Sequence, residues 1–327
     1  MRTPPNPRTE RRTSSPRVSG DAEERWPDTP LRIGISGWTY GPWRGVFYPT
    51  ELAQKDELHF ASRQFNSIEI NGSFYSLQRP SSYEQWYART PANFVFSVKG
   101  ARFITHMKKL RDVQTPLANF FGSGVLALRE KLGPVLWQFP PNFGWNEQRF
   151  REFFELLPRD TAEAAELARL HDEKVKYGIW TNIDVARPLR YCVEVRHPTF
   201  LVPEFFALLR AYNVAFVYAD TAGKWPYAED LTADFAYIRL HGAEQLYVSG
   251  YSEPQLEWWR ARIEFWRRGK QPPDARLTSP VKHKPGVRDV YAYFDNDAKV
   301  HAPFDAGKLS QMLGLQVPPF VTPPARR

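Results

Sequence analysis

The sequence predicts an α/β fold: a single (β/α)8 TIM-type barrel preceded by a disordered N-terminal extension. The first observation behind this prediction is a series of eight short apolar runs, which helical-looking stretches separate almost throughout. The second is that nearly every run ends in a polar or charged residue, because such a barrel carries its chemistry at the C-terminal ends of its strands. The expected strands are residues 33–36, 67–71, 94–99, 134–138, 191–196, 214–220, 235–241 and 290–295.

The helices are expected between or after these strands. Several of them begin at Pro or follow Ser, Thr or Asp, which are the residues that helix N-termini prefer. The connection over residues 159–190 is longer than a strand–helix unit needs and contains an Ala/Glu-rich helix, 161–176. Residues 269–288 form a Pro-rich, basic loop that is expected at the surface. The other expected helices lie near residues 52–65, 82–89, 116–131, 147–156, 203–212, 254–268 and 304–312.

The first thirty residues differ in composition from the rest of the chain. They carry six Pro, six Arg and five acidic residues, with almost no large apolar side chains. Such a segment cannot bury enough surface to offset its ordering entropy, so residues 1–30 are expected to be disordered. The segment also lacks the apolar core of a secretory signal. The barrel is expected to span residues 31–315, followed by a Pro-rich C-terminal tail, 316–327.

Charge and cysteine content limit the partners and the compartment. The 327 residues carry a formal net charge of +8 at pH 7, which favours anionic partners such as phosphates or nucleic acid. Solubility alone would explain this charge equally well. The sole cysteine, Cys192, excludes an internal disulfide and suits a reducing cytoplasm. No apolar run approaches the roughly 18 residues that a membrane span needs, so no membrane partner is expected.

Alternation along the strands predicts which side chains face the barrel interior. Successive side chains point to opposite faces of a strand, and the positions that meet the helices must be apolar. The alternate positions that carry polar side chains are therefore expected to point inward. The second through seventh strands each have such a set of positions. The residues of this parity are Glu69 and Asn71, Ser97 and Lys99, Leu136 and Gln138, Glu194 and Arg196, Tyr218 and Asp220, and Tyr237, Arg239 and His241.

The inferred upper interior holds three acids and three bases, with one histidine nearby. Equal numbers of acids and bases can form ion pairs, and buried charges must pair to offset the cost of their desolvation. One interpretation is therefore a packed ion-pair network. The favoured interpretation is a ligand site, because a structural core would more simply use Val, Ile and Leu. The residues concerned are Glu69, Glu194, Asp220, Lys99, Arg196, Arg239 and His241.

Acid–base chemistry and anion binding are the roles that these residue types fit. Arg196 can bind a phosphate or carboxylate bidentately. His197 can exchange protons near neutral pH, or it can cap a turn ahead of Pro198, and Asp220 can likewise open a turn. The candidate catalytic residues are Glu69, Glu194, His241 and Asp220. The candidate substrate-binding residues are Asn71, Lys99, His106, Gln138, Arg196, His197, Arg239 and Asn296.

No cofactor is predicted and no metal ligand is assigned. Carboxylates and histidines of the right type are present, but the interspersed cations compete for the carboxylates, and no His-x-His or His-Glu-x-x-His spacing occurs. A divalent metal stays open as an alternative. Lys99 raises the question of a Schiff base, because a strand-end lysine among apolar groups can have a lowered pKa. Nearby carboxylates are expected to keep Lys99 charged, which favours anion binding instead.

Eight segments, in order along residues 31–315, resemble the YecE-like family of uncharacterised proteins, the domain of unknown function seventy-two. They are GISGWTYGPW at 34–43, FYP at 47–49, FNSIEINGSFY at 65–75, FSVKGARFITH at 96–106, LGPVLWQFPP at 132–141, EVRHP at 194–198, RLHG at 239–242 and YFDND at 293–297.

The resemblance implies a TIM-type barrel, distantly sugar-isomerase-like, with no settled reaction. Asp295 stands where the family typically carries Asn. The positions that match the family's polar motifs are Glu69, Asn71, Lys99, His106, Gln138, Glu194, Arg196, His197, Asp220, Arg239, His241 and Asn296.

These features together predict an enzyme that acts on a small anionic or sugar-like substrate at the C-terminal rim of the barrel. Acid–base chemistry of the isomerase or lyase type fits such a site. Trp38, Tyr40 and Trp43 could stack on a sugar ring or a base, or could simply pack their loop. The alternatives are a nucleic-acid-binding or -processing protein that uses its basic surface, and a non-catalytic binder of a small ligand.

Overall fold

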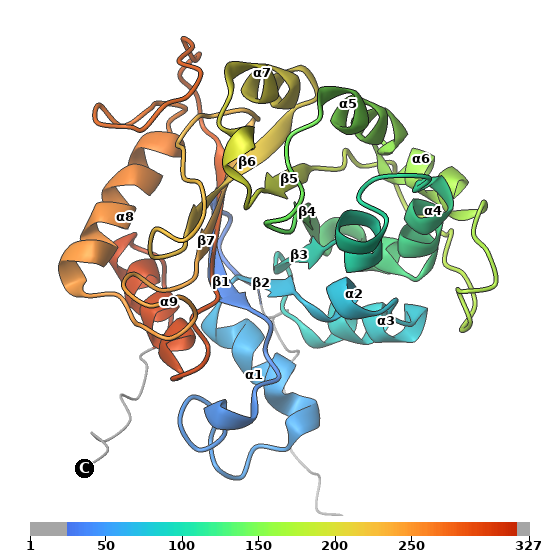
Figure 1. The fold of residues 1–327 in the computed structure, drawn as a ribbon. Coiled ribbons are helices and arrows are strands. Elements are labelled where there is room, and N and C mark those ends of the chain that lie inside the picture. Colours follow the sequence, from blue (N-terminus) through green and yellow to red (C-terminus); the bar gives the residue numbers. More distant parts are fainter. Residues whose placement is uncertain (1–24, 319–327) are drawn as a thin grey trace, which may run out of the picture.

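Eight parallel strands close into one barrel in the computed structural model, which describes residues 25–318 (Figure 1). Each strand pairs with its neighbour in sequence, and β8 returns to pair with β1. The predicted (β/α)8 barrel and all eight of its strands are thereby confirmed. The strands are β1 Leu31–Ser36, β2 Ser67–Ile70, β3 Val95–Lys99, β4 Leu132–Gln138, β5 Tyr191–Glu194, β6 Val214–Asp220, β7 Phe235–Leu240 and β8 Asp289–Phe294.

Helices surround the strands on the outside of the barrel (Figure 1). Within residues 25–318, no helix separates β6 from β7, where residues 221–234 form an irregular connection. None of the helices of this part of the chain combines the length and the apolar character that crossing a bilayer requires. The α-helices are α1 Glu57–Gln64, α2 Gly72–Tyr75, α3 Pro80–Arg89, α4 Gln114–Gly122, α5 Glu147–Leu156, α6 Thr161–Ala168, α7 Pro203–Ala211, α8 Glu253–Trp266 and α9 His301–Met312.

Side-chain caps explain where several helices begin. Asn146 accepts a hydrogen bond from the backbone N–H of Arg149 at 2.9 Å at the start of α5. Asp160 does the same for two backbone N–H groups at the start of α6. Ser252 and Gln255 form a capping box before α8, which satisfies N–H groups that the helix itself leaves unpaired.

Two predicted helices are shorter in the structure than in the sequence analysis. The helix expected over residues 116–131 ends at Gly122, and a separate short helix, Val125–Lys131, follows it. Gly124 lies between them with a φ of 116°, a left-handed conformation that interrupts a helix and favours glycine. The helix expected over residues 161–176 ends at Ala168.

The packed part of the chain begins earlier than the predicted boundary at residue 30. The indole Nε1 of Trp26 donates a hydrogen bond to the backbone carbonyl of Ser62 at 2.9 Å, and its backbone N–H donates to Ala92 at 3.1 Å. Asn93 also donates to Asp28, and Val290 donates to the backbone carbonyl of Pro30, so residues 25–30 contact the barrel at several points. The rest of the predicted extension, residues 1–24, and most of the predicted tail lie outside the described residues.

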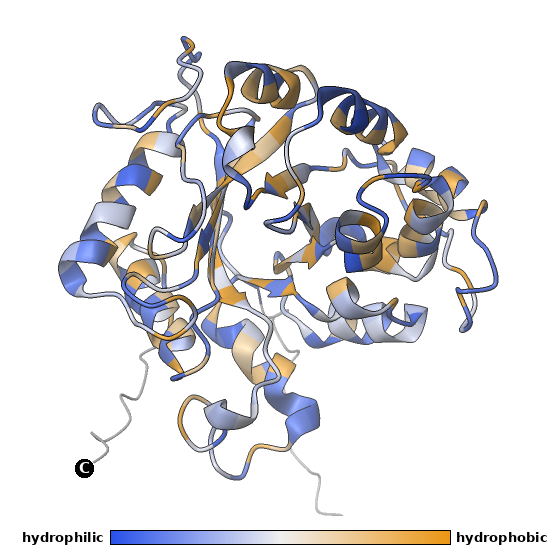
Figure 2. Ribbon diagram, in the orientation of Figure 1, coloured by the Kyte–Doolittle hydropathy of each residue, from blue (hydrophilic) through white to orange (hydrophobic). Residues whose placement is uncertain are grey.

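Hydrophobic side chains fill two spaces, one between the strands and the helices and one inside the barrel. Figure 2 shows largely hydrophobic strands, whereas α5 carries hydrophilic residues on its outward side. The interior is rich in tyrosine, and its hydroxyls are paired across the barrel. Tyr293 lies 2.6 Å from the Ser67 hydroxyl, and Tyr237 lies 2.6 Å from that of Ser97. The interior group is Leu136, Cys192, Ala215, Val217, Ala219, Ala233, Phe235, Tyr237, Tyr291 and Tyr293.

The inward parity predicted for β6 is wrong. Ala215, Val217 and Ala219 face the interior, while the Tyr218 ring packs outward, 4.3 Å from the ring of Trp266 in α8. The physical reason is size: small side chains on β6 leave room inside for the tyrosines and the arginine of β7 and β8. Since Asp220 shares the parity of Tyr218, it is turned away from the interior.

We expect Gly34→Ala to destabilise the barrel where β1 meets β2. A Cβ at residue 34 would lie 1.8 Å from the backbone oxygen of Ser67, so the two paired strands would have to separate. The expected loss in the free energy of unfolding is at least about 1–3 kcal/mol, the usual cost of overpacking.

Urea unfolding followed by tryptophan fluorescence measures this loss. Gly41→Ala is the matched control, because a Cβ there has no atom within 4 Å, and its change should stay within about 0.5 kcal/mol. Equal stability of the two variants would contradict the prediction.

Candidate functional site

The guanidinium of Arg239, in β7, lies at the centre of the upper barrel interior and is fully buried. It donates hydrogen bonds to Glu69 of β2 at 2.8 Å and to Glu194 of β5 at 2.6 Å. Asp295, just after β8, accepts a third at 2.8 Å. The strands β2, β5 and β7 are not neighbours, so their side chains can meet only inside the barrel. The inward polar parity of these three strands is therefore confirmed.

Both carboxylate oxygens of Glu69 are fully engaged. Oε1 accepts hydrogen bonds from the Ser36 hydroxyl and from Arg239, and Oε2 accepts from Tyr237 at 2.6 Å and from Arg239 at 3.1 Å. Asn71 donates to the same Ser36 hydroxyl at 2.9 Å, so the amide at the end of β2 belongs to this network. Glu69 is completely buried, and its hydrogen bonds hold the side chains around it in place.

Glu194 links the interior network to the barrel mouth. One of its oxygens accepts hydrogen bonds from Gln138 at 2.7 Å and from Arg196 at 3.0 Å, and the other accepts from Arg239. Burial alone would raise the pKa of this carboxyl, but Arg239 and Arg196 hold it well below its ordinary value. Glu194 is therefore a carboxylate that fixes the position of Arg196.

His241 is also completely buried, between a cation and an acid. Its Nε2 lies 3.3 Å from Nη1 of Arg239, and its Nδ1 lies 3.0 Å from a carboxylate oxygen of Asp295. A guanidinium only donates, so Nε2 is the acceptor in its contact with Arg239, whereas Nδ1 makes no hydrogen bond within residues 25–318.

Lys99 ends β3 above this network. Its ammonium group, unlike the charged groups of the network, has no hydrogen-bonding partner among the described residues. Within residues 25–318, its Nζ makes no hydrogen bond or ion pair, and the side chain of Phe74 lies beneath it, with 4.3 Å between Nζ and the ring centroid. Burial lowers the pKa of Lys99 to about 8, and the positive charge of Arg239 acts in the same direction. The carboxylates that were expected to pair with Lys99 are bound by Arg239 instead.

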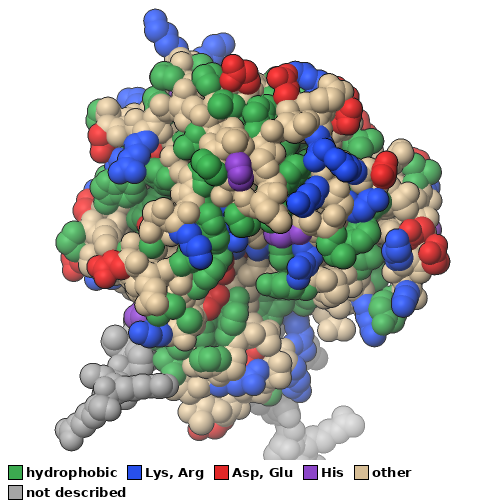
Figure 3. All heavy atoms as spheres, viewed as in Figure 1, with side chains coloured by type: hydrophobic (Ala, Val, Ile, Leu, Met, Phe, Trp, Pro, Cys, Tyr) green, Lys and Arg blue, Asp and Glu red, His purple; other side chains and the backbone are tan. Residues whose placement is uncertain are grey.

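Three cations surround His106 at the mouth. Burial lowers the pKa of His106 to about 4, and the charges of Arg196, Lys99 and Arg102 act in the same direction. His106 is therefore neutral at physiological pH, and its Nδ1 lies 2.8 Å from the hydroxyl of Thr105. Figure 3 shows Lys and Arg side chains around a histidine near the middle of this face. The mouth is thus positively charged.

Arg196 is held in place by aromatic side chains from two loops. Its guanidinium lies 3.6 Å from the ring centroid of Trp225 and donates a hydrogen bond to the Tyr247 hydroxyl at 3.1 Å. Stacking and the bond to Glu194 leave an edge of the side chain, 13% exposed, at the mouth. A rigid, partly exposed guanidinium of this kind suits a carboxylate or phosphate.

Three predicted site residues lie elsewhere. Asp220, turned outward on β6, accepts a hydrogen bond from the Tyr251 hydroxyl at 3.2 Å. His197 caps the turn that begins at Pro198, with its Nδ1 2.8 Å from the Thr199 hydroxyl, so the turn-capping alternative is confirmed. Asn296 is fully buried and donates to Asp305 at 2.8 Å, which joins the end of β8 to α9. Their assigned roles in catalysis or binding stay predictions.

An open groove of about 320 Å³ adjoins the mouth. Trp38 and Tyr40, which the sequence analysis offered for stacking, line it together with Asn71. Trp43 does not, because it is fully buried in the packing of its loop. The groove residues are Gly37, Trp38, Thr39, Tyr40, Ile70, Asn71, Gly72, Tyr75, Gln78 and Trp86.

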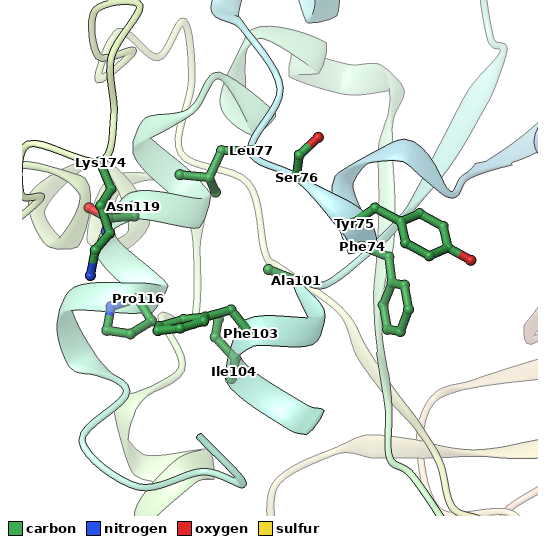
Figure 4. Close-up of a pocket in the computed structure, with 10 residues that line it drawn as sticks. All are labelled: Phe74, Tyr75, Ser76, Leu77, Ala101, Phe103, Ile104, Pro116, Asn119 and Lys174. Carbon is green, nitrogen blue, oxygen red and sulfur yellow. The ribbon is translucent and has the colours of Figure 1, made fainter. Parts of the chain in front are cut away.

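A smaller, apolar pocket of about 150 Å³ lies on the other side of Phe74 (Figure 4). Figure 4 shows Leu77 and Phe103 on opposite sides of this pocket, and Lys174 across it from Phe74. Phe74 therefore contributes both to this pocket and to the surroundings of Lys99.

The basic loop 269–288 lies at the opposite end of the barrel from the mouth. It precedes β8 in the chain, and two of its backbone N–H groups, of Thr278 and Ser279, donate to Asp230 at 2.8 and 2.7 Å. Residues 230–234 lead into the N-terminal end of β7. The loop therefore adds nothing to the charge of the mouth, and nucleic-acid binding through it stays a prediction.

The acidic and histidine side chains of the site were also candidates for metal ligands. Among residues 25–318, no three His, Cys, Asp or Glu side chains are grouped so that they could hold a metal ion. The acids of the upper interior instead surround Arg239.

Some residues of the site were not predicted from the sequence. Ser36 ends β1 and could have been found from its position, since the other strand ends already pointed to this rim. Tyr237 shares the parity of Arg239 but was not assigned a role. Trp225 and Tyr247 come from irregular loops, where no periodic signal places a side chain.

Comparison with known proteins identifies a family and individual relatives of this chain. A family model described as protein of unknown function DUF72 matches residues 32–327. The chain is 31% identical over 118 residues to the UPF0759 protein YunF of Bacillus subtilis, a match over 35% of this chain and 41% of that one. It is 25% identical over 173 residues to the UPF0759 protein YecE of Escherichia coli, over 52% and 50% of the two chains. The chain therefore spans half or less of the length of these relatives.

Solved structures share the fold. A DUF72 family protein of Thermotoga maritima superposes with a TM-score of 0.64 at 24% identity, over 87% of this chain and 99% of that one. A DUF72 family protein of Enterococcus faecalis superposes with a TM-score of 0.63 at 14% identity, over 91% and 99% of the two chains. At these identities the likeness concerns the fold alone.

We expect Arg239→Met to cost about 3–5 kcal/mol of the free energy of unfolding, because it leaves buried carboxylates without their shared cation. Neutralising two of those acids in the triple variant Arg239→Met, Glu69→Gln, Asp295→Asn should restore part of the loss. Chemical denaturation measures both changes.

Arg260→Met provides a matched control, since Arg260 pairs with Glu257 on the exposed face of α8 and such a pair is worth at most about 1 kcal/mol. A loss in Arg239→Met no larger than in this control would show that the network does not stabilise the barrel.

Proposed function

Because the chain belongs to the DUF72 family, whose description assigns no activity, we propose a function from the geometry of the barrel mouth. The proposal is an enzyme that binds a small anionic substrate at the mouth and transfers protons on it. A sugar-like body of the substrate would lie in the adjoining groove.

Charge balance carries the proposal. The upper barrel holds four cations, Arg239, Arg196, Lys99 and Arg102, against the carboxylates of Glu69, Glu194 and Asp295. A fourth acid, Asp297, lies next to Asp295, and burial together with the charge of Asp295 raises its pKa well above the ordinary value, which favours its uncharged form. All three carboxylates bind Arg239, so the positive charge that remains lies at the mouth, next to His106. A concave site that is lined by one sign of charge attracts ligands of the other sign.

Lys99 fits the role of the acid–base group better than the buried acids do. A catalytic proton donor or acceptor works best with a pKa near the operating pH, and the pKa of Lys99 is about 8. Glu69, Glu194 and His241, which the sequence analysis assigned to catalysis, are buried and hydrogen-bonded. In this proposal they hold Arg239 and Arg196 in place, and their direct participation stays a prediction.

The groove beside the mouth supports a substrate with a flat or ring-shaped body. Trp38 and Tyr40 offer aromatic faces there, and the amides of Asn71 and Gln78 offer hydrogen-bonding groups. The chain has a single cysteine, the buried Cys192, and so needs no internal disulfide, which supports a location in the reducing cytoplasm.

A thermal-shift screen of the full chain against inorganic phosphate, sugar phosphates and small carboxylates tests the proposal. A ligand at about 100 times its Kd stabilises the protein by about 2.7 kcal/mol, which gives a clear shift in Tm. We expect Arg196→Ala to abolish the shift, because the anion loses its guanidinium.

Arg260→Ala, on the outer face of α8, should keep the full shift. A ligand that stabilises Arg196→Ala as much as the wild-type protein would contradict a site at the mouth. Turnover of a stabilising ligand separates an enzyme from a non-catalytic binder.

A further inference from the structure

We propose that Lys99 is a nucleophile that forms an imine with the aldehyde or ketone group of a small anionic substrate. This inference rests on the proposed function, since the anion would be held at the same mouth. It goes further, because it names the reacting atom, Nζ of Lys99, and the carbonyl class of the substrate.

The surroundings of Nζ distinguish Lys99 from the other deeply buried lysine, Lys131. The ammonium of Lys131 donates to the backbone oxygens of Tyr87 and Thr90, both at 2.8 Å, and to the Thr90 hydroxyl at 3.2 Å. These bonds occupy the N–H groups of Lys131. Across residues 25–318, Nζ of Lys99 has no bond of this kind, although the side chain is only 7% exposed.

The network below Lys99 explains why its amine is left without a counter-ion. Glu69, Glu194 and Asp295 would each be a suitable partner, but Arg239 binds all three. The ring of Phe74 attracts an ammonium only weakly and accepts none of its protons in a strong bond. Burial and the cation of Arg239 therefore both favour the neutral amine.

The neutral amine is populated at physiological pH. With a pKa of about 8, about a tenth of Lys99 is unprotonated at pH 7. An ordinary exposed lysine has a pKa near 10.4, so its amine fraction at pH 7 is more than about a hundredfold smaller. Lys99 is the more reactive nucleophile for this reason.

The chemical step balances without an oxidant or a reductant. The Nζ lone pair attacks the carbonyl carbon, a C–N bond forms, and the carbonyl oxygen takes up the proton that nitrogen loses. The hydroxyl oxygen of the resulting carbinolamine then takes up a proton from solvent, its C–O bond breaks so that water leaves, and the nitrogen lone pair forms the C=N bond of a protonated imine. The protonated imine withdraws electrons from the adjacent carbon, which eases the breaking of a C–H or C–C bond there, as an isomerase or a lyase requires.

The positions of the cations define the substrate further. Arg196 offers an exposed edge for a carboxylate or phosphate, and Arg102 lies at the rim of the same group of cations. The substrate is therefore a small oxo compound that carries an anionic group, either a 2-oxo acid or a phosphorylated sugar.

Borohydride trapping tests the inference on the full chain. The protein is incubated separately with pyruvate, glyoxylate, dihydroxyacetone phosphate and glyceraldehyde 3-phosphate, then reduced with sodium cyanoborohydride and analysed by intact mass and peptide mapping. We expect one adduct per chain on Lys99 with at least one probe, and an adduct yield at Lys131 and at the exposed Lys308 at least tenfold lower. The probe that reacts tells a 2-oxo acid from a sugar phosphate.

Two variants and the pH dependence of labelling show whether Lys99 itself forms the adduct. Lys99→Arg should lose the adduct, because a guanidinium forms no imine under these conditions, whereas Lys308→Arg should label like the wild-type protein. The rate of labelling should rise with pH and level off above about 8, unlike that of surface lysines.

A thermal shift with the same probes, without reductant, separates the two proposals. A probe that stabilises the protein in an Arg196-dependent manner but leaves Lys99 unlabelled would overturn the imine and leave the anion site standing. If no probe either stabilises the protein or labels Lys99, both proposals fail. Labelling of Lys99 no faster than that of Lys308 would also overturn the inference.

Discussion

The contact between Arg239 and three carboxylates is the interaction on which the rest of the barrel mouth depends. Each of Glu69, Glu194 and Asp295 comes from a different strand or strand end, and none could stay charged in the interior without a cation. One guanidinium satisfies all of them because its donors point in several directions. The upper barrel is therefore formed as a unit, since removal of the arginine leaves several buried charges at once.

The same contact sets the chemistry of the mouth. Since Arg239 occupies the acids, Lys99 has no counter-ion, and Arg196 is fixed by Glu194, Trp225 and Tyr247 with one edge left at the surface. His106 stays neutral among these cations. The buried network around Arg239 therefore leaves positive charge, and the reactive amine of Lys99, at the mouth where the loops meet solvent. The buried acids, whose oxygens already accept hydrogen bonds, support such a site by holding its cations in place.

The strands, their order and most of their inward faces could be predicted from the sequence, because period-two alternation and polar strand ends are local signals. The alternation failed in β6, where size decides: Ala215 and Val217 go inside to make room for larger neighbours, and Asp220 is turned outward with Tyr218. Volume complementarity between strands cannot be judged one strand at a time.

The roles within the site were harder to predict than its members. Residue types alone made Glu69 and His241 candidates for proton transfer, but only the full set of partners shows that both oxygens of Glu69 accept hydrogen bonds and that Nε2 of His241 contacts Arg239. The sequence predicted that carboxylates would keep Lys99 charged, but it could not show that Arg239 binds those carboxylates or that burial lowers the pKa of Lys99 to about 8. Trp225 and Tyr247 lie on loops whose paths follow from tertiary packing.

The most direct test of this account is a crystal structure of the protein soaked in sodium bromide, with anomalous scattering used to locate the anion. The account predicts a bromide peak at the mouth within about 3.5 Å of Nζ of Lys99 or the guanidinium of Arg196, with Arg239 still bound to all three carboxylates. An ion pair between Lys99 and Glu69, Glu194 or Asp295, with no anion at the mouth, would contradict it.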